Sequence, residues 1–234
     1  PMLFNSLAFC VFFPLVVAGY FLTPPRARWA WLLAASYVFY AWWKIEYTLL
    51  LAFSTLVDYG AARAMGRHAT RRGRRPYLLA SLGVNLGVLV GFKYLGFFSQ
   101  SLGTLLHGAG MAYAPAGLNV LLPVGISFYT FQTMAYSIDV YRGVQAPEKH
   151  LGRFALYVSF FPQLVAGPIE RSTHLLPQFR EKMRWDDARV ASGLQLMLWG
   201  FFKKLVIADR LALYVNEVYA APGAHAGWPV VLAT

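Results

Sequence analysis

Long apolar stretches, separated by short charged or proline-rich breaks, dominate the hydrophobic pattern of the chain. The first stretch, residues 3–22, carries no charged residue and has about the length that an α-helix needs to cross a bilayer, roughly 20 residues. Pro24 and Pro25 follow it, and proline ends a helix because it lacks the amide proton that continues the hydrogen-bonded turn. The pattern therefore predicts membrane-spanning helices and excludes an ordinary soluble domain.

The next apolar stretch, residues 29–62, is too long for one crossing. As a single helix it would measure about 50 Å, against a hydrocarbon core of about 30 Å. Lys44 and Glu46 interrupt it, so we expect two short helices joined by a tight turn. The densest basic segment follows, with Arg63, Arg67, Arg71, Arg72, Arg74 and Arg75. Because arginine-rich loops stay in the cytoplasm, we expect a cytoplasmic loop at 63–76 and, with two crossings in 29–62, an extracytoplasmic N-terminus.

Residues 77–98 form another apolar stretch, which we expect to be a further span. Gly83, Gly87 and Gly91 lie four residues apart in it, a spacing that predicts close contact with another helix. The glycine-rich, weakly polar residues 99–118 are expected to be an extracytoplasmic loop.

The last full apolar stretch, residues 192–214, contains two charged pairs, Lys203-Lys204 and Asp209-Arg210. Charges in the middle of a span are costly. We therefore expect the helix to break at the membrane interface, where lysine side chains reach back to water. Residues 228–234 have the composition of the start of another span.

A polar stripe distinguishes residues 121–142. Tyr129, Gln132, Tyr136 and Asp139 follow one another at spacings of three, four and three, so they share one face of a helix. In a membrane chain such a stripe faces the protein interior or a wet cavity. The alternative is a solvated helix that lies in the interface.

Residues 160–171 cannot form one continuous helix, because Pro162, Gly167 and Pro168 interrupt them. Non-helical backbone at membrane depth is tolerated only where protein buries it or where it lines a cavity. The segment is therefore either a re-entrant element or a helix end that surfaces at the interface.

Composition narrows the classes of function. Apolar residues make up 58% of the chain and charged residues 13%, about half the share of roughly 25% in soluble domains. The net charge of +11 does not indicate nucleic-acid binding, because the basic residues punctuate apolar stretches; they suit orientation in the membrane and contact with anionic lipids. Cys10 is the single cysteine and the histidines lie far apart, so no metal site is expected.

Three ordered motifs carry a family resemblance. They are residues 122–132 (LPVGISFYTFQ) continuing to 138–143 (IDVYRG), residues 160–163 (FFPQ) with 167–171 (GPIER) and 176–179 (LPQF), and residues 199–205 (WGFFKKL); the start at 2–6 (MLFNS) also matches. Together they resemble the membrane-bound O-acyltransferase family, in particular its polysaccharide-acetylating branch, over nearly the whole chain.

The resemblance implies an all-α, polytopic membrane fold with short, broken and re-entrant helices around a funnel. Residues 1–234 would form the N-terminal portion of a single transmembrane domain. The resemblance further implies transfer of an acetyl group from a cytoplasmic thioester, with acetyl-CoA as donor substrate and no bound cofactor, toward an extracytoplasmic polysaccharide such as alginate. It places the protein in the bacterial inner membrane, with lipids and extracytoplasmic acetyl-transfer proteins as partners.

The catalytic histidine of that family follows tryptophan and arginine residues, and no histidine of this chain has that context. We therefore expect it beyond residue 234 and expect this chain alone to be inactive. His174, which follows the GPIER motif, is a weaker catalytic alternative.

The candidate residues of the substrate path are Tyr129, Gln132, Asp139, Gln163, Glu170 and Arg171. For Glu170 and Arg171 a structural pairing at the helix break is the competing interpretation. Two other functions remain open, a transporter or channel, which polar stripes and broken helices also build, and a non-catalytic scaffold of a polysaccharide export complex.

Overall fold

The computed structural model describes residues 2–108, 123, 125–164, 167, 170–221, 223–224 and 227–233, and its regular elements are all helical. Contacts divide the chain into two compact units, Pro1–Lys182 and Met183–Thr234. The elements of the first unit are α1 (Leu7–Leu22), α2 (Arg28–Ala41), α3 (Ile45–Met65), α4 (Arg71–Lys93), α5 (Leu95–Gly108), α6 (Ile126–Arg142), α7 (Leu151–Ser159), α8 (Phe161–Leu164) and α9 (Ser172–Gln178). The all-α fold class is confirmed for the described chain.

The first unit opens with two antiparallel helices. Ser6 caps α1, because its hydroxyl accepts a hydrogen bond from the Phe9 amide at 3.2 Å. The prolines after Thr23 end the helix as predicted. Trp31 of α2 then packs back on α1, where its indole Nε1 donates to the Val16 carbonyl at 2.9 Å. Gly19 makes room for that indole, since a Cβ there would lie 2.3 Å from the ring.

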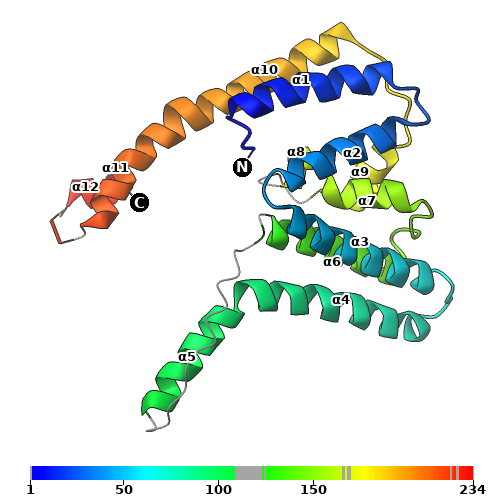
Figure 1. Cartoon of the computed structure of the whole chain (residues 1–234), viewed down its shortest axis with the longest axis horizontal. Coiled ribbons are helices and arrows are strands. Elements are labelled where there is room, and N and C mark those ends of the chain that lie inside the picture. Colours follow the sequence, from blue (N-terminus) through cyan, green and yellow to red (C-terminus); the bar gives the residue numbers. More distant parts are fainter. Residues whose placement is uncertain are drawn as a thin grey trace. The chain divides into compact units, whose positions relative to one another are not determined.

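The predicted split of residues 29–62 is confirmed, because α2 ends at Ala41 and α3 begins at Ile45. α3, α4 and α6 pack against one another and form the main apolar core with α7 (Figure 1). α1 to α4 run back and forth, so the α1–α2 and α3–α4 turns lie at the same side of the first unit, and the α6–α7 connection lies there too (Figure 1). The basic residues of these two turns and of the α6–α7 connection therefore lie at one end of the first unit.

Two predicted loops are wrong in part. Residues 71–76 belong to the first turns of α4, because Thr70 caps that helix by accepting a hydrogen bond from the Gly73 amide at 3.3 Å. Pro76 is tolerated there because it lies near the start of the helix, where few amides need a partner. Residues 99–108 lie in α5, and the rest of the predicted 99–118 loop is outside the described residues. Glycine content misled the prediction, because α5 forms in spite of it.

The prediction for the glycines of α4 is also wrong. A Cβ at Gly83, Gly87 or Gly91 would meet nothing within 4 Å, so these glycines do not bring another described helix close. Instead, α4 buries the face that carries Ser81 and Asn85. The face of α4 that contacts other helices is marked by polar side chains and not by the glycines.

The second unit contains one long helical run, α10 (Asp187–Phe201), η1 (Phe202–Ala208) and α11 (Asp209–Ala220), and a short α12 (Trp228–Ala233). The predicted break of the helix at its charged pairs is wrong. The backbone widens into the π-helical η1 segment, and Lys204 bonds Asp209 at 2.5 Å. Pairing lets the charges stay on a continuous helix, and π-helical turns recur where a long helix absorbs such an irregularity.

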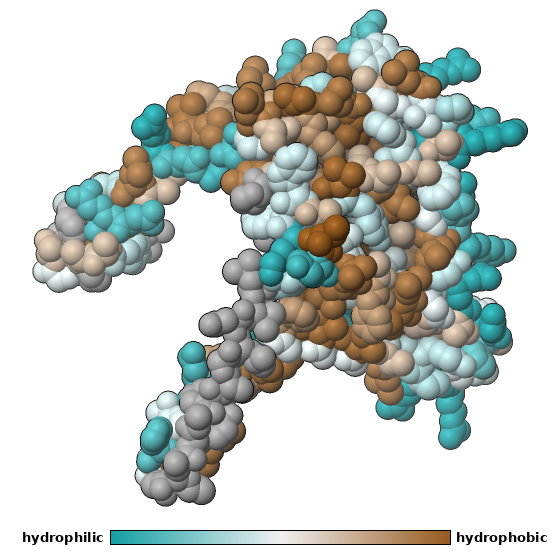
Figure 2. All heavy atoms as spheres, viewed as in Figure 1, coloured by the Kyte–Doolittle hydropathy of each residue, from teal (hydrophilic) through white to brown (hydrophobic). Residues whose placement is uncertain are grey.

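Among the described residues, two helical runs are long and apolar enough to cross a membrane, Arg71–Lys93 and Asp187–Ala220. α1 is as apolar but shorter. Figure 2 shows apolar side chains over much of the visible surface, with hydrophilic side chains projecting along the edge where the α1–α2 and α3–α4 turns lie. Exposed leucine, phenylalanine and tryptophan side chains occur on every long helix, a pattern that suggests a membrane protein.

Candidate functional site

α6 turns its polar stripe toward the interior of the first unit. Tyr129, Gln132 and Tyr136 are buried, Asp139 is half-buried, and Phe128 on the neighbouring face is exposed. The helix is fixed at both ends by glycines with left-handed backbone, because Gly125 has φ 75° and Gly143 has φ 79°. The predicted inward orientation of the stripe is confirmed, and its role in a substrate path stays a prediction.

Hydrogen bonds connect this stripe to the broken segment. Gln132 Nε2 donates to the Tyr157 carbonyl at 2.9 Å, and the Tyr157 hydroxyl donates to the Glu170 carbonyl at 3.2 Å. Within the part of the chain that the structure describes, the buried Tyr129 hydroxyl has no hydrogen-bond partner. The structure therefore brings Gln132 and Glu170 into one network through Tyr157.

Sequence reasoning missed a second polar cluster, at the contact of α3, α4 and α6. Asp58 is fully buried; Ser81 Oγ donates to its Oδ1 at 2.6 Å, and Asn85 Nδ2 lies 2.8 and 3.0 Å from its two carboxylate oxygens. From α6, the Thr133 hydroxyl lies 3.3 Å from Asn85 Oδ1, and the Ser137 hydroxyl lies 3.0 Å from that of Ser81. A signal for this cluster exists in the sequence, because Asp58 is an acidic residue inside an apolar stretch and such residues mark functional or structural centres.

The broken segment forms the wall of a small cavity. α7 ends at Ser159, the short α8 follows, and α9 begins at Ser172. The cavity of about 290 Å³ is lined by Phe160, Pro162, Gln163, Gly167, Glu170, His174, Leu175 and Gln178. Two predicted site residues, Gln163 and Glu170, thus meet in one cavity. Arg171, the residue that precedes α9, is not among the residues that line this cavity.

Gln163 is the chemically unusual member of this cavity. The residue is 8% exposed, and within the described chain both its amide nitrogen and its amide oxygen are buried without a hydrogen-bond partner. A buried amide without partners costs about 1–3 kcal/mol. Gly167 allows the tight turn around it, since a Cβ there would lie 2.6 Å from the Gln163 Cα. A side chain kept at such a cost marks a place where a ligand can supply the missing bonds.

Glu170 pairs with His174 and not with Arg171, the partner considered from the sequence. His174 Nδ1 lies 3.1 Å from Glu170 Oε2, and both side chains are at least partly exposed. The pair is spaced four residues apart, across the start of α9. A carboxylate on one ring nitrogen orients an imidazole. The competing structural interpretation paired Glu170 with Arg171, and the structure gives Glu170 a different partner.

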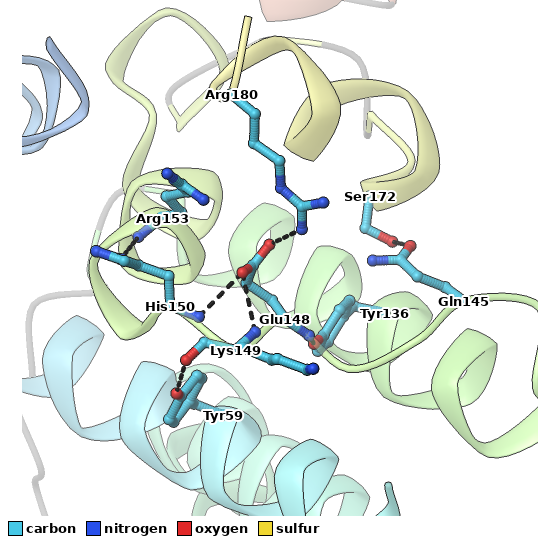
Figure 3. Close-up of polar contacts among 9 residues, drawn as sticks. All are labelled: Tyr59, Tyr136, Gln145, Glu148, Lys149, His150, Arg153, Ser172 and Arg180. Atoms are coloured by element: carbon cyan, nitrogen blue, oxygen red, sulfur yellow. Dashed lines mark hydrogen bonds and ion pairs between the residues drawn. The ribbon is translucent and has the colours of Figure 1, made fainter. Parts of the chain in front are cut away.

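A larger cavity, of about 670 Å³, lies at the basic end of the first unit, between the α6–α7 connection and α9. Glu148, at the centre of Figure 3, organises its wall. Oε1 of Glu148 accepts the amide protons of Lys149 and His150, both at 2.9 Å, and Oε2 pairs with Arg180. The Glu148 amide in turn donates to the Tyr136 hydroxyl at 2.9 Å. Tyr136 of the buried stripe thus hydrogen-bonds the wall of this cavity.

Electrostatics keep Glu148 charged. Burial alone raises the pKa of this carboxyl, but hydrogen bonds from Arg180 and from the amides of His150 and Lys149 outweigh burial, so the pKa is lowered below its usual value. The carboxylate is therefore an anchor for the connection, and it offers no free oxygen to a further ligand. Among the described residues, no group of three histidine, cysteine, aspartate or glutamate side chains is placed to hold a metal ion.

Comparison with known proteins gives relatives over nearly the whole chain. The chain is 40% identical to the probable alginate O-acetylase AlgI of Pseudomonas aeruginosa over 222 residues, which are 94% of this chain and 42% of that protein. The probable alginate O-acetylase AlgI of Azotobacter vinelandii is 38% identical, again over 94% of this chain and 44% of its own length. The resemblance to the membrane-bound O-acyltransferase family is confirmed.

The chain is also similar to a peptidoglycan O-acetyltransferase of Helicobacter pylori, which is 31% identical over 92% of this chain and 46% of its own length. The chain thus spans less than half the length of the curated relatives it matches. No family model matches the chain, and no solved structure matches it. The family assignment therefore rests on these relatives and on the motifs of the sequence.

Proposed function

We propose that the protein acts as a membrane O-acetyltransferase, which passes an acetyl group from a cytoplasmic thioester to a polysaccharide outside the membrane. One observation carries the proposal, namely 40% identity over 94% of the chain to a protein named as an alginate O-acetylase. The chain supplies the inner wall of the path, with Tyr129, Gln132 and Asp139 on α6 and Gln163, Glu170 and Arg171 at the broken segment.

The reaction breaks the acyl carbon–sulfur bond of the donor and forms an ester bond to an acceptor hydroxyl. A base removes the hydroxyl proton as attack occurs, and the donor leaves as a thiol that takes up a proton. A neutral imidazole performs such a step near pH 7. The family resemblance places that imidazole beyond residue 234, so we expect residues 1–234 alone not to turn over.

The broken segment supports the proposal most directly. The free amide of Gln163 presents one donor and one acceptor side by side, which suits a hydroxyl or an amide of a passing substrate. Glu170 and His174 line the same cavity. The polar network from Gln132 through Tyr157 to Glu170 then holds this backbone in place without regular helix.

The charge distribution supports the proposed topology, and the family resemblance supports the proposed partners. We propose a multi-pass protein of the bacterial inner membrane, with the basic end of the first unit in the cytoplasm and the N-terminus outside. The donor, acetyl-CoA or a similar thioester, then enters from the basic end. Lipids surround the exposed apolar faces, and acetyl-transfer proteins outside the membrane are the expected protein partners. Alginate is the expected acceptor, and peptidoglycan is the alternative that the Helicobacter pylori relative supports.

The test is an acetyl-ester assay on envelope polysaccharides after deletion of the gene, with complementation by the whole gene. Loss of ester from alginate, restored by the wild-type gene, supports the proposal. A Gln163→Leu gene should restore the protein to normal abundance but not the ester. A transporter or an export scaffold would instead change the amount of polysaccharide and leave its acetyl content per sugar unchanged, which would overturn the proposal.

A further inference from the structure

The cavity beside the α6–α7 connection is not used by the proposed substrate path at the broken segment. It lies at the end of the first unit that carries the basic turns. Three contacts fix the α6–α7 connection at this end. The Tyr59 hydroxyl of α3 donates to the Lys149 carbonyl at 2.6 Å, and a Cβ at Gly66 would lie 2.5 Å from Pro147. Trp29, at the start of α2, packs its ring against His150 with centroids 4.5 Å apart. Contacts from α2, α3 and the turn after α3 thus fix the connection that walls the cavity.

The wall of the cavity is cationic. Lys149, Arg153 and Arg180 line it, against a single carboxylate, Glu148. Both oxygens of that carboxylate are already occupied, by two amides and by Arg180 (Figure 3). The two remaining positive charges, of Lys149 and Arg153, have no acidic partner among the described ion pairs. The field at the cavity therefore favours an anion.

Arg153 carries the most specific signal. Its Nε atom is buried and has no hydrogen-bond partner within the described chain. A buried guanidinium nitrogen without an acceptor is costly, because a charged donor loses water and gains nothing in return. The side chain starts in the first turn of α7, where the helix dipole adds further positive potential. An anion that enters the cavity can supply the missing acceptor.

From this arrangement we infer that the cavity binds a phosphate group of a small organic ligand, with Arg153 as its principal contact and Lys149 and Arg180 as supporting cations. Arginine matches phosphate oxygens with its fork of N–H donors. The Thr173 hydroxyl, which also lines the cavity, adds a neutral donor. A volume of about 670 Å³ holds a phosphate together with the organic group that carries it.

The carrier of this phosphate is the phosphorylated part of the thioester donor, and this identification rests on the proposed function. The phosphate contact itself rests only on the cavity. A lipid headgroup presents the same chemistry from the membrane side, so the experiment must separate the two sources.

The experiment measures equilibrium binding of coenzyme A to the purified chain in a detergent with an uncharged headgroup, by calorimetry. Pantetheine, which lacks the phosphates and the adenosine of coenzyme A, is the comparison ligand. We expect pantetheine to bind at least about tenfold more weakly, and Arg153→Gln to weaken coenzyme A by about tenfold or more, as loss of one charge-assisted hydrogen bond predicts. Pantetheine binding should not change in that variant.

Arg72→Gln is the control, because it removes the same charge at an exposed position of the same basic end, away from the cavity. Equal affinities for coenzyme A and pantetheine would refute the site, and so would equal effects of Arg153→Gln and Arg72→Gln. If Arg153→Gln does not fold, inorganic pyrophosphate must still compete with coenzyme A on the unaltered chain. Failure of pyrophosphate to compete would also refute the site.

Nanodiscs distinguish the sources of phosphate. One outcome is that phosphatidylglycerol, but not phosphatidylcholine, displaces coenzyme A from the wild type and not from Arg153→Gln. In that case the site is a phosphate site that a lipid also fills. The outcome is separable from the proposed function. If the unaltered chain binds coenzyme A no more tightly than pantetheine, while acetyl esters in cells depend on the gene, the phosphate site alone is refuted. Persistent acetyl esters after gene deletion, with phosphate binding intact, refute the acetyltransferase proposal alone.

Discussion

Substitution of Asp58 by alanine tests whether the buried polar cluster holds α3, α4 and α6 together. The side chain is fully buried and accepts from both Ser81 and Asn85. In the alanine variant the Ser81 hydroxyl turns to Ser137, 3.0 Å away, and loses little. Asn85 Nδ2 keeps the Ser81 carbonyl at 2.9 Å but loses its carboxylate acceptor.

One orphaned buried donor costs about 1–3 kcal/mol, and the small cavity left by the carboxyl adds a little under about 1 kcal/mol. We therefore expect Asp58→Ala to destabilise the protein by about 2–4 kcal/mol. For a chain of this size that corresponds to a fall in Tm of about 5–15 °C. Asp58→Asn keeps one oxygen for Ser81 but sets an amide group against Asn85, so we expect a loss of about 1–2 kcal/mol.

The assay is thermal unfolding in detergent at one fixed scan rate, because irreversible unfolding makes Tm depend on the rate. Glu181→Ala, at an exposed loop position, is the control and should stay within about 0.5 kcal/mol of the wild type. A Tm for Asp58→Ala within about 2 °C of the control would show that the cluster contributes nothing to stability, and the reasoning from burial would be refuted.

Three further outcomes are expected from the same measurement. Gly125→Ala should destabilise the protein by more than about 2 kcal/mol, because the φ of Gly125 is 75° and a Cβ there would lie 2.3 Å from the Leu164 carbonyl oxygen. Gly87→Ala should instead stabilise α4 by up to about 1 kcal/mol, because a Cβ there would meet nothing within 4 Å. Equal effects of the two substitutions would contradict this reasoning. Gln163→Leu should raise stability by about 1–3 kcal/mol as it abolishes acetylation in the whole protein, since the unpartnered amide is removed; a fall in stability would contradict the claim that the amide lacks a partner. Because the pKa of Glu148 is lowered in the folded state, its stabilisation is present above the ordinary glutamate pKa of about 4.3 and is lost as pH falls through the folded value. The Tm difference between wild type and Glu148→Gln should therefore shrink below about pH 4.3, and a difference that stays constant with pH would contradict the charge argument.

Periodicity found the helices whose boundaries are marked by proline or by charge. Pro24 and Pro25 end α1, and Lys44 separates α2 from α3, where the sequence places both breaks. It failed at α5 and at η1. Glycines in α5 and charges around Lys204 argue against helix, yet both segments are helical, and Lys204 pairs with Asp209 on the same helical run.

The candidate site divides in the same way. The stripe of α6 was readable, because spacing alone puts Tyr129, Gln132 and Tyr136 on one face, and all three are buried. The pairing of Glu170 was not readable, since Arg171 is its neighbour in sequence while His174 reaches it only after the chain turns into α9.

By itself, then, the sequence determined the apolar helical character of the chain, its family motifs and the face that α6 buries, because these depend on composition and on spacing along one helix. Only the tertiary structure decided which polar groups meet. Asp58, Ser81 and Ser137 lie on three different helices, and the cavity of Arg153 is closed by α9, a separate helix that begins only after the broken segment. Contacts of that kind depend on how helices pack, which no local pattern encodes.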